Sequence, residues 1–441
     1  MSKFKRYERY KDSGVEWIGE IPEHWGVIKL KYVTKLAYGD SLPTENREEE
    51  GEVDVFGSNG KVGTHNVANT LSPVIIVGRK GSYGKVTYSD KKCFAIDTTY
   101  YIDNRCTKSN IKWLYYSLMV LELDKNSQDT GVPGLSREYA YNKYVPVPTV
   151  NEQVAIANFL DQKTAEIDGL IADKEKLIEL LQEKRQAIIT EAVTKGLNPN
   201  VKMKDSGIEW IGEIPEEWEL IKIKFVGTIY SGNGFKEELQ GKTEGDYPFF
   251  KVSDINGNGK LAISSNNYVD EDDVVNNGWN IIPKNSILFP KIGEALKKNH
   301  RKINACSCLI DNNIAAIKTN ERIIDFNYFY YYFCCVNAEW FVNPGAVPSI
   351  NNAYLKNFMV LLPSKNEQTA IANFLDQKTA EIDDLIFDIY TQIQKLKEYR
   401  QSLISEAVTG KIDVREFGNM SEVIYYEQNN SPCSEFTHAA E

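Results

Sequence analysis

The stretch that decides the fold is NEQVAIANFLDQKTAEIDGLI, residues Asn151 to Ile171, which recurs 215 residues later as NEQTAIANFLDQKTAEIDDLI, Asn366 to Ile386. A second stretch, KDSGVEWIGEIPEHW at Lys11 to Trp25, recurs 193 residues later as KDSGIEWIGEIPEEW at Lys204 to Trp218. Chance does not produce both matches, so the chain contains an internal duplication. Each half is a near-identical frame around a divergent segment.

The divergent segments keep traces of the duplication. Val132 to Leu135 (VPGL) aligns with Val347 to Ile350 (VPSI) at the offset of 215, whereas Ile75-Ile76 matches Ile287-Leu288 best near 212. Two nearly identical frames are expected if both bind the same partner. Two divergent segments are expected if each binds a different target. The alternative is a recent duplication followed by neutral drift, but drift alone would place substitutions in the frames as often as in the divergent segments.

Each repeated stretch opens a long amphipathic helix, the first from Asn151 to about Gly196. Its apolar positions recur at alternating steps of four and three residues, the seam of a coiled coil. At about 1.5 Å per residue such a helix extends roughly 65 to 70 Å, so we interpret it as a spacer. The expected seams are Leu160, Thr164, Ile167, Ile171, Lys174, Ile178, Leu181, Arg185, Ile188 and Ala192, and Leu375, Thr379, Ile382, Ile386, Ile389, Ile393, Leu396, Arg400, Leu403 and Ala407.

Neither helix can bury its stripe alone, so we expect the two to pair antiparallel about a pseudo-two-fold axis. The alternative is that each stripe packs on a different partner subunit. The expected start signals are Pro148 with Asn151, and Pro363 with Ser364; the expected stops are Gly196 and Gly410.

The predicted fold class is α+β: two mixed α/β domains separated by two long antiparallel coiled-coil helices, with a pseudo-two-fold internal repeat. The expected divisions are a frame segment at 1–25, a variable domain at 26–150, a long helix at 151–203, a second frame segment at 204–218, a second variable domain at 219–365, a second long helix at 366–417, and a disordered tail at 418–441.

Composition is that of a folded protein, with 42% hydrophobic and 26% charged residues. No apolar run is long enough for a membrane span and the first residues lack a signal-peptide core, so a cytoplasmic location is expected. The net charge of −11 argues against nucleic acid, but the surplus acid lies outside the variable domains. Residues 26–150 hold 16 basic and 14 acidic residues, and residues 219–365 hold 16 and 15.

Short β-rich runs predict the cores of the variable domains. Pro73 to Val77 and Ile287 to Pro290 are expected to be buried strands, and the runs at 86–88, 94–96 and 100–102 could continue a meander. Ile111 to Leu123 and Phe326 to Trp340 are predicted helices rich in aromatic residues. Their helical spacing favours core packing over base stacking.

The best candidates for DNA contact follow the strands. Gly78 to Lys85 (GRKGSYGK) is a glycine-rich turn whose cations, hydroxyls and amides suit phosphate, and whose arginine suits guanine. Its counterpart is Lys291 to Gly293, followed by basic residues at 297–302. A proline turn precedes each long helix, at Gly131 to Arg137 and at Gly345 to Asn352. Alternatively, the basic turns are merely solvated and the proline turns are packing hinges.

Catalytic signatures are missing. The spacing of a phosphate-binding loop, a base-methylation motif and a recognisable nucleophile are not found, and the scattered cysteines and histidines lack the spacing of a zinc site. We therefore expect no catalytic residue, no bound cofactor and no metal in this chain.

The ordered set of motifs resembles the specificity subunits of type I restriction-modification systems. The set is WIGEIPxxW, then VIIVGRKGSYG in the divergent segment, the VPGLSR turn, and PxxxEQxAIANFLD opening a long helix, with the frame elements repeated from residue 11 to about 415. The resemblance implies two target recognition domains that each read one half of a split, asymmetric sequence in double-stranded DNA.

The same resemblance implies partners. Two methyltransferase subunits, carrying S-adenosylmethionine and modifying adenine, would dock on the repeated helices, and restriction subunits would add ATP- and Mg-dependent translocation and cleavage. The implied contacts of the first half-site are Arg79, Lys80, Ser82, Tyr83, Lys85, Ser136 and Arg137; those of the second are Lys291, Lys297, Lys298, Arg301, Lys302, Ser349 and Asn351. The second turn departs from the first, since Ile292, Glu294 and Ala295 stand where the first has Lys80, Ser82 and Tyr83.

Two other functions compete with this reading. A self-sufficient nuclease or methyltransferase is disfavoured by the missing catalytic motifs, and a coiled-coil scaffold that never meets DNA is disfavoured by divergent segments on a shared frame.

Overall fold

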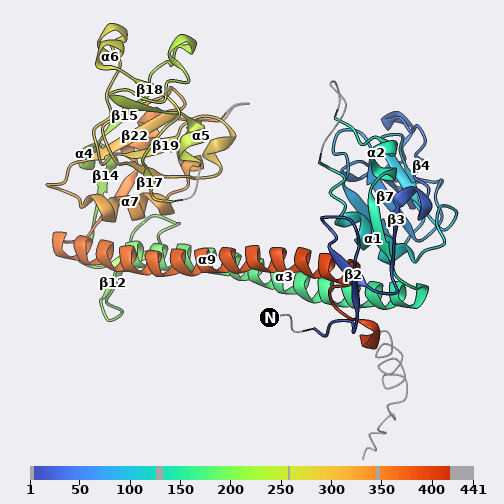
Figure 1. The fold of residues 1–441 in the computed structure, drawn as a ribbon. Coiled ribbons are helices and arrows are strands. Elements are labelled where there is room, and N and C mark those ends of the chain that lie inside the picture. The colour runs from blue at the N-terminus through green and yellow to red at the C-terminus, as the bar shows by residue number, and fades with distance from the viewer. Residues whose placement is uncertain (1–3, 126–132, 257–258, 344–347, 418–441) are drawn as a thin grey trace, which may run out of the picture. The chain divides into compact units, whose positions relative to one another are not determined.

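The computed structural model describes residues 4–125, 133–256, 259–343 and 348–417 (Figure 1). It forms two compact units: unit 1 is Met1–Lys174 with Thr391–Glu441, and unit 2 is Glu175–Tyr390. Both long helices pass from one unit into the other. The expected tail at 418–441, and the first residues of both proline turns, lie outside the described residues.

Each repeated stretch forms one uninterrupted helix, α3 (Val150–Lys195) and α9 (Lys365–Val408). Glu152 and Thr149 hydrogen-bond reciprocally at the start of α3, and Glu367 and Ser364 do the same at the start of α9, so each start is a capping box. The hydroxyl residue before the helix is therefore the cap, rather than Asn151. The expected stops are confirmed, since Gly196 and Gly410 follow the two ends with φ of 76° and 72°.

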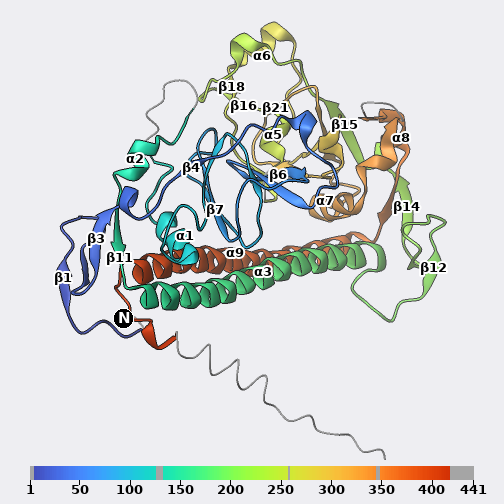
Figure 2. The same cartoon turned by 90° about the vertical axis from the view of Figure 1, so that its right-hand side faces the viewer.

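The two long helices pair antiparallel within each unit (Figures 1 and 2). In unit 1, Arg400 binds Asp168 at 2.8 Å and Lys174 donates to Gln392 at 2.6 Å. In unit 2, Arg185 lies 3.3 Å from Asp383. Every expected seam position is buried or half-buried, while most of the helix surface between them is exposed. The pairing that the sequence predicts is confirmed, so the alternative of separate partners for the two stripes is not needed.

Two sheets form the core of the variable segment in unit 1. The larger has the order β4-β10-β7-β8 and is antiparallel throughout, and the smaller has the order β6-β5-β9. The expected strand at 94–96 therefore does not continue a meander, because β9 pairs in parallel with β5 in the other sheet. The strands are β4 (Ala37–Tyr38), β5 (Val53–Gly57), β6 (Gly60–His65), β7 (Val74–Gly78), β8 (Val86–Ser89), β9 (Phe94–Ala95) and β10 (Thr99–Ile102).

Unit 2 repeats this core with one more strand in its larger sheet. The order β15-β22-β19 corresponds to β4-β10-β7, and β20 and β17 extend it. A second sheet has the order β18-β16-β21. The strands are β15 (Gly227–Ser231), β16 (Tyr247–Phe250), β17 (Leu261–Ala262), β18 (Tyr268–Val269), β19 (Ile287–Pro290), β20 (Lys302–Asn304), β21 (Leu309–Ile310) and β22 (Ile314–Thr319), and the short helices are α4 (Ile223–Val226), α5 (Val252–Ile255) and α6 (Glu271–Asn277).

An aromatic helix joins each core to the long helices: α1 (Ile111–Met119) in unit 1 and α7 (Phe326–Cys335) in unit 2. Their aromatic side chains are core, as expected, since Trp113, Tyr328 and Phe329 are fully buried. Tyr116 on α1 donates to Asp161 of α3 at 2.8 Å and also contacts Thr164; Tyr331 on α7 makes the same pair of contacts with Asp376 and Thr379 of α9, the first at 2.7 Å. These contacts explain part of the identity between the two repeated stretches.

In each unit the repeated frame packs against the start of one long helix and the end of the other. In unit 1, Trp25 donates to Glu152 at 3.1 Å, and Pro22 and Trp25 pack so closely on Gly410 that a side chain there would clash, with Pro22 first. In unit 2, Trp218 donates to Glu367 at 3.4 Å and packs on Gly196. The frame strands are β1 (Tyr10–Asp12) and β2 (Glu20–Pro22), with copies β12 (Met203–Asp205) and β13 (Glu213–Pro215). Each variable segment begins and ends on a paired strand: β3 (Gly26–Lys29) pairs with β11 (Tyr144–Val147), and β14 (Glu219–Lys222) with β25 (Met359–Leu362).

Candidate nucleic-acid interface

In unit 1 the glycine-rich turn and the proline turn form one surface. The glycine-rich turn follows β7, and Gly84 (φ 77°) donates to the carbonyl oxygen of Gly78 at 2.8 Å and closes it. Gly81 donates to the carbonyl oxygen of Pro133 at 3.1 Å, and Leu135 donates to that of Arg79 at 2.8 Å. Two loops that lie more than fifty residues apart in the sequence are therefore held together by their backbones.

Two arginines of this surface flank an exposed aromatic ring. The guanidinium carbons of Arg79 and Arg137 lie 5.4 Å and 4.8 Å from the ring centroid of Tyr38, which is 49% exposed. Arg79 also donates to the backbone carbonyl of Asp97, at 3.1 Å and 2.7 Å. Cation–π contacts and a carbonyl acceptor orient the guanidinium groups without neutralising them.

Tyr38 rests in turn on a buried tyrosine. Its ring centroid lies 5.1 Å from that of Tyr100 in the neighbouring strand β10, and the Tyr100 hydroxyl donates to the carbonyl oxygen of Leu135 at 3.1 Å. Burial and the neighbouring Tyr38 raise the pKa of Tyr100 to about 12, so its hydroxyl stays a donor at neutral pH. Sequence reasoning missed Tyr38, because a single aromatic residue in a two-residue strand carries no pattern.

The other expected residues of unit 1 lie around this cluster. Lys80 and Ser82 are exposed and Tyr83 is half-buried. Lys85 is exposed and donates to the carbonyl oxygen and side chain of Asn59, at 2.8 Å and 3.0 Å. Ser136 is the N-cap of α2 (Arg137–Tyr141), so its position also has a structural reason.

Unit 2 presents the same scaffold with other side chains. Gly293 donates to the carbonyl oxygen of Pro348 at 2.8 Å, and Ile350 donates to that of Lys291 at 2.9 Å, which repeats the two hydrogen bonds of unit 1. Lys80 forms an isolated bridge with Gly134, and Ile292 forms one with Ser349. These contacts place Lys291 at the position of Arg79, and Ile292 at that of Lys80.

The remaining residues expected in unit 2 divide into exposed and structural ones. Lys297 and Lys298 are exposed, and Lys297 forms an ion pair with Glu294 at 2.9 Å. Ser349 lies in β24 (Ser349–Ile350), which pairs with β23 (Val342–Asn343), and is half-buried. Asn351 caps α8 (Asn352–Asn357), as Ser136 caps α2.

The structure contradicts the expectation for Arg301 and Lys302, which are only 5% and 6% exposed. The Arg301 guanidinium lies between the rings of Phe289 and Phe333, at 5.4 Å and 4.6 Å, and donates to Asn299 at 2.8 Å. Burial lowers its pKa to about 10, which leaves it charged at neutral pH. Arg301 directly precedes β20, Lys302 begins it, and burial removes both from any surface that DNA can reach.

The described residues contain no group of three or more His, Cys, Asp or Glu side chains placed to hold a metal ion. Over the same ranges, every helix is too short or too polar to cross a membrane.

Comparison with known proteins gives a consistent picture. The family model described as the type I restriction modification DNA specificity domain matches residues 22–180 and 215–395. The chain is 23% identical over 417 residues to the type I restriction enzyme MjaVIII specificity subunit of Methanocaldococcus jannaschii, covering 90% of this chain and 94% of that one. It is 23% identical over 361 residues to the EcoBI specificity subunit of Escherichia coli, covering 77% and 73%.

A solved structure, titled for complex assembly and conformational transition of the type I R-M system, has the same fold. It aligns with a TM-score of 0.64 at 13% sequence identity and covers 88% of this chain and 98% of that chain.

Proposed function

The chain belongs to the type I restriction modification DNA specificity family, and from that premise we propose that it reads a bipartite, asymmetric DNA sequence and directs methylation or cleavage by partner subunits. Unit 1 reads one half-site and unit 2 the other. The chain contributes no catalytic group, and S-adenosylmethionine, ATP and Mg²⁺ bind to the partners.

One observation carries this proposal: the two units hold different side chains at matched positions of one scaffold. The paired turns of unit 1 present Arg79 and Arg137 around Tyr38, whereas unit 2 has Lys291 at the position of Arg79. A duplicated scaffold with exchanged polar groups suits the reading of two different base sequences, because base edges differ in their donors and acceptors.

The chemistry of the unit 1 cluster suits guanine. An arginine can donate two parallel hydrogen bonds to O6 and N7 of guanine in the major groove. Arg79 and Arg137 stack on a ring and keep their charge, so these donors are oriented in advance. Exposed Lys80 and Lys85 follow Arg79 in the same glycine-rich turn and suit phosphate contact. In unit 2, Lys291, Lys297, Lys298, Ser349 and Asn351 remain the candidates.

A second surface suits a protein partner met twice. Asn151, Asn158, Gln162 and Ala165 are spaced along one face of α3, and all are exposed. Their identical copies on α9, also exposed, are Asn366, Asn373, Gln377 and Ala380. Because these side chains are exposed, packing in the core does not explain why they are identical in the two helices. We assign this repeated helix face to the docking of two copies of one methyltransferase subunit.

The experiment that tests the function is methylome sequencing of cells with and without this gene, with the partner genes expressed in both. The expected result is methylated adenine in a two-part asymmetric sequence that disappears when the gene is deleted. An unchanged methylome, with all partners present, would overturn the proposal.

A further inference from the structure

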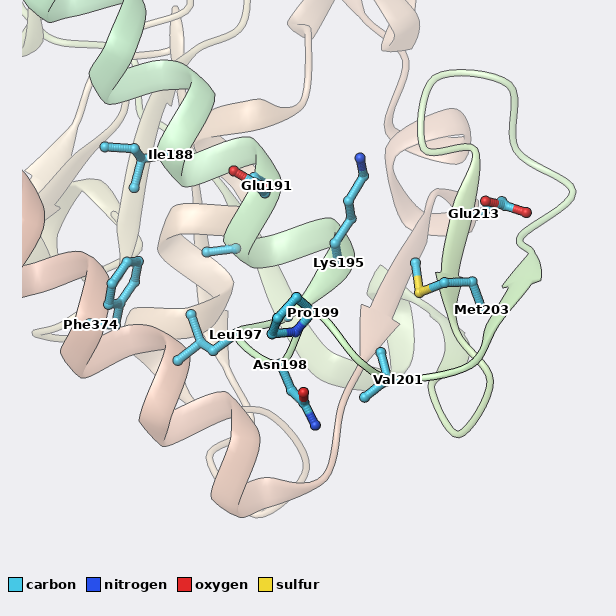
Figure 3. A pocket seen from close by; sticks show the side chains of 12 residues that line it. Ile188, Glu191, Lys195, Leu197, Asn198, Pro199, Val201, Met203, Glu213 and Phe374 are labelled. Atoms are coloured by element: carbon cyan, nitrogen blue, oxygen red, sulfur yellow. The ribbon is translucent and has the colours of Figure 1, made fainter.

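A pocket of about 720 Å³ lies in unit 2 where the C-terminal end of α3 meets the first turns of α9 (Figure 3). Ile188 of α3 and Phe374 of α9 line one side, Met203 of β12 lines the other, and Leu197 and Pro199 lie between them. Phe374 is half-buried and Leu197 is 44% exposed, so apolar side chains face an open space.

The duplication shows what the corresponding place in unit 1 contains. Phe159 is the copy of Phe374 and is fully buried, because Phe4 and Phe417 pack edge-on against it with ring centroids at 5.2 Å and 4.9 Å. Two chain segments converge there, and the backbone amide of Asp413 donates to the carbonyl oxygen of Lys5 at 2.8 Å. In unit 1, therefore, two aromatic rings cover this phenylalanine.

Unit 2 has only one of these two segments. Residues 197–203 run directly from α3 into the second frame, and at the frame offset Leu197 is the copy of Phe4. Ile412, which follows α9 in unit 1, is 1% exposed, whereas Leu197, which follows α3 in unit 2, is 44% exposed. The ring that Phe417 supplies in unit 1 has no counterpart in residues 197–203, and the pocket occupies its place.

The two units also differ in the charged residues beside this place. Glu20 of unit 1 forms an ion pair with Arg6 at 3.7 Å. In unit 2 their copies are Glu213, which lines the pocket, and Pro199, which carries no charge. An occupant that carries a basic residue beside an aromatic one would supply both the missing ring against Phe374 and an ion-pair partner for Glu213.

We propose that the pocket receives one aromatic side chain, flanked by a lysine or arginine, from the methyltransferase subunit that docks on unit 2. This inference rests on the proposed function, and the repeated helix face supports it, because Asn373 of that face directly precedes Phe374. In unit 1 the equivalent place is already filled by Phe417, so the subunit that docks there cannot insert an aromatic side chain. The two docking sites therefore differ in affinity although their helix faces are identical.

The test is the binding of the purified methyltransferase subunit to the full chain, measured by titration calorimetry and by native mass spectrometry. Asn198→Trp puts a large side chain at the exposed rim of the pocket, and Phe374→Ala removes its apolar wall. Lys204→Trp, at an exposed position of β12 outside the pocket lining, is the matched control. Thermal melting reports whether each variant folds as the parent does.

We expect two bound copies on the parent chain and on Lys204→Trp. In Asn198→Trp and Phe374→Ala, one of the two copies should bind about tenfold more weakly or worse, because a buried aromatic anchor dominates interface affinity. Two copies bound to folded pocket variants with parental affinity, or equal weakening of both copies, would overturn the inference while leaving the proposed function standing. Failure of the parent chain to bind any copy would overturn the proposed function itself. Self-association of the parent chain that Asn198→Trp abolishes would assign the pocket to a second copy of this chain instead.

Discussion

At the residue scale, the cluster of Arg79, Arg137 and Tyr38 is the centre of the DNA contact that we propose for unit 1. Each arginine is oriented by contacts that leave its positive charge intact. Side chains positioned before binding lose less conformational entropy when they meet a base, which favours specificity over general attraction to phosphate.

Replacing Arg79 by alanine is expected to relax discrimination in the first half-site alone. Loss of one bidentate arginine–guanine pair weakens discrimination at that base pair by about tenfold, from about 1–3 kcal/mol per pair. Competition binding with the partner subunits and oligonucleotides varied at each half-site measures the effect, and Lys291→Ala serves as the matched variant in unit 2. Equal losses on unrelated DNA would reduce Arg79 to a phosphate contact.

Two substitutions of Tyr38 distinguish the role of its ring from the role of its hydroxyl group. Tyr38→Phe keeps the ring between the two arginines, so half-site discrimination should stay close to that of the parent. Tyr38→Leu removes the cation–π contacts and should relax the first half-site while leaving the second unchanged, with little change in the melting temperature, because the side chain is half exposed. Methylome sequencing of both variants tests this, and a motif that stays intact in Tyr38→Leu would rule out a positioning role.

Arg301 is expected to act through stability instead of DNA contact. Arg301→Ala removes the guanidinium from between Phe289 and Phe333 and takes away one of the two donors to the Asn299 side-chain carbonyl, which should lower the free energy of unfolding by about 2 kcal/mol. Denaturant titration measures this, with exposed Lys298→Ala as the control that should unfold like the parent. The assignment fails if Arg301→Ala unfolds like the parent and yet loses DNA affinity.

These residues also mark how far the sequence could predict the site. The two turns were identifiable from glycine, proline and charge, and the structure brings them together. The basic run at 297–302 looks uniformly solvated in sequence, but Arg301 and Lys302 enter the core there, a change that charge content does not reveal. Tyr38 becomes meaningful only when the sheet places it beside Arg79 and Arg137, and no local pattern encodes that contact.

At the element scale, the paired helices were predictable because their signal is long and periodic. The steps of four and three residues identify the seams of α3 and α9, and the antiparallel direction follows from the duplication. The short strands were less accessible. β9 is two residues long and pairs in parallel with β5, a long-range choice that its own sequence does not specify.

The pairing of the helices allows a sharp test of their role as a spacer. Lys174 contacts Gln392, so residues 172–178 of α3 lie opposite residues 389–395 of α9. Deleting both heptads together preserves the seam and shortens each helix by about 10 Å. If the helices set the distance between half-sites, the methylome motif should keep both half-sites and lose about three base pairs of spacer, at about 3.4 Å per base pair.

Deleting residues 172–178 alone is the matched control, because it leaves a heptad of α9 without its partner and should abolish activity. Changed bases within a half-site, with the spacer unchanged, would contradict this division of labour.

At the scale of the whole molecule, duplication explains both the sameness and the difference of the two units. The identical residues include those that hold the variable cores to the helices, those that pack on the helix ends and those of the repeated helix face. The differing residues include those on the paired turns and those that leave the pocket of unit 2 open. Under the proposed function, one scaffold used twice meets one kind of partner and two different DNA sequences.

The most direct test of this account replaces residues 26–150 with residues 219–365, so that both units carry the second variable segment, followed by methylome sequencing with the partner subunits. The account predicts that the asymmetric motif becomes symmetric, with two copies of the second half-site in inverted orientation and the first half-site gone. A motif that keeps the first half-site, in an exchanged chain that is folded and active, would contradict it.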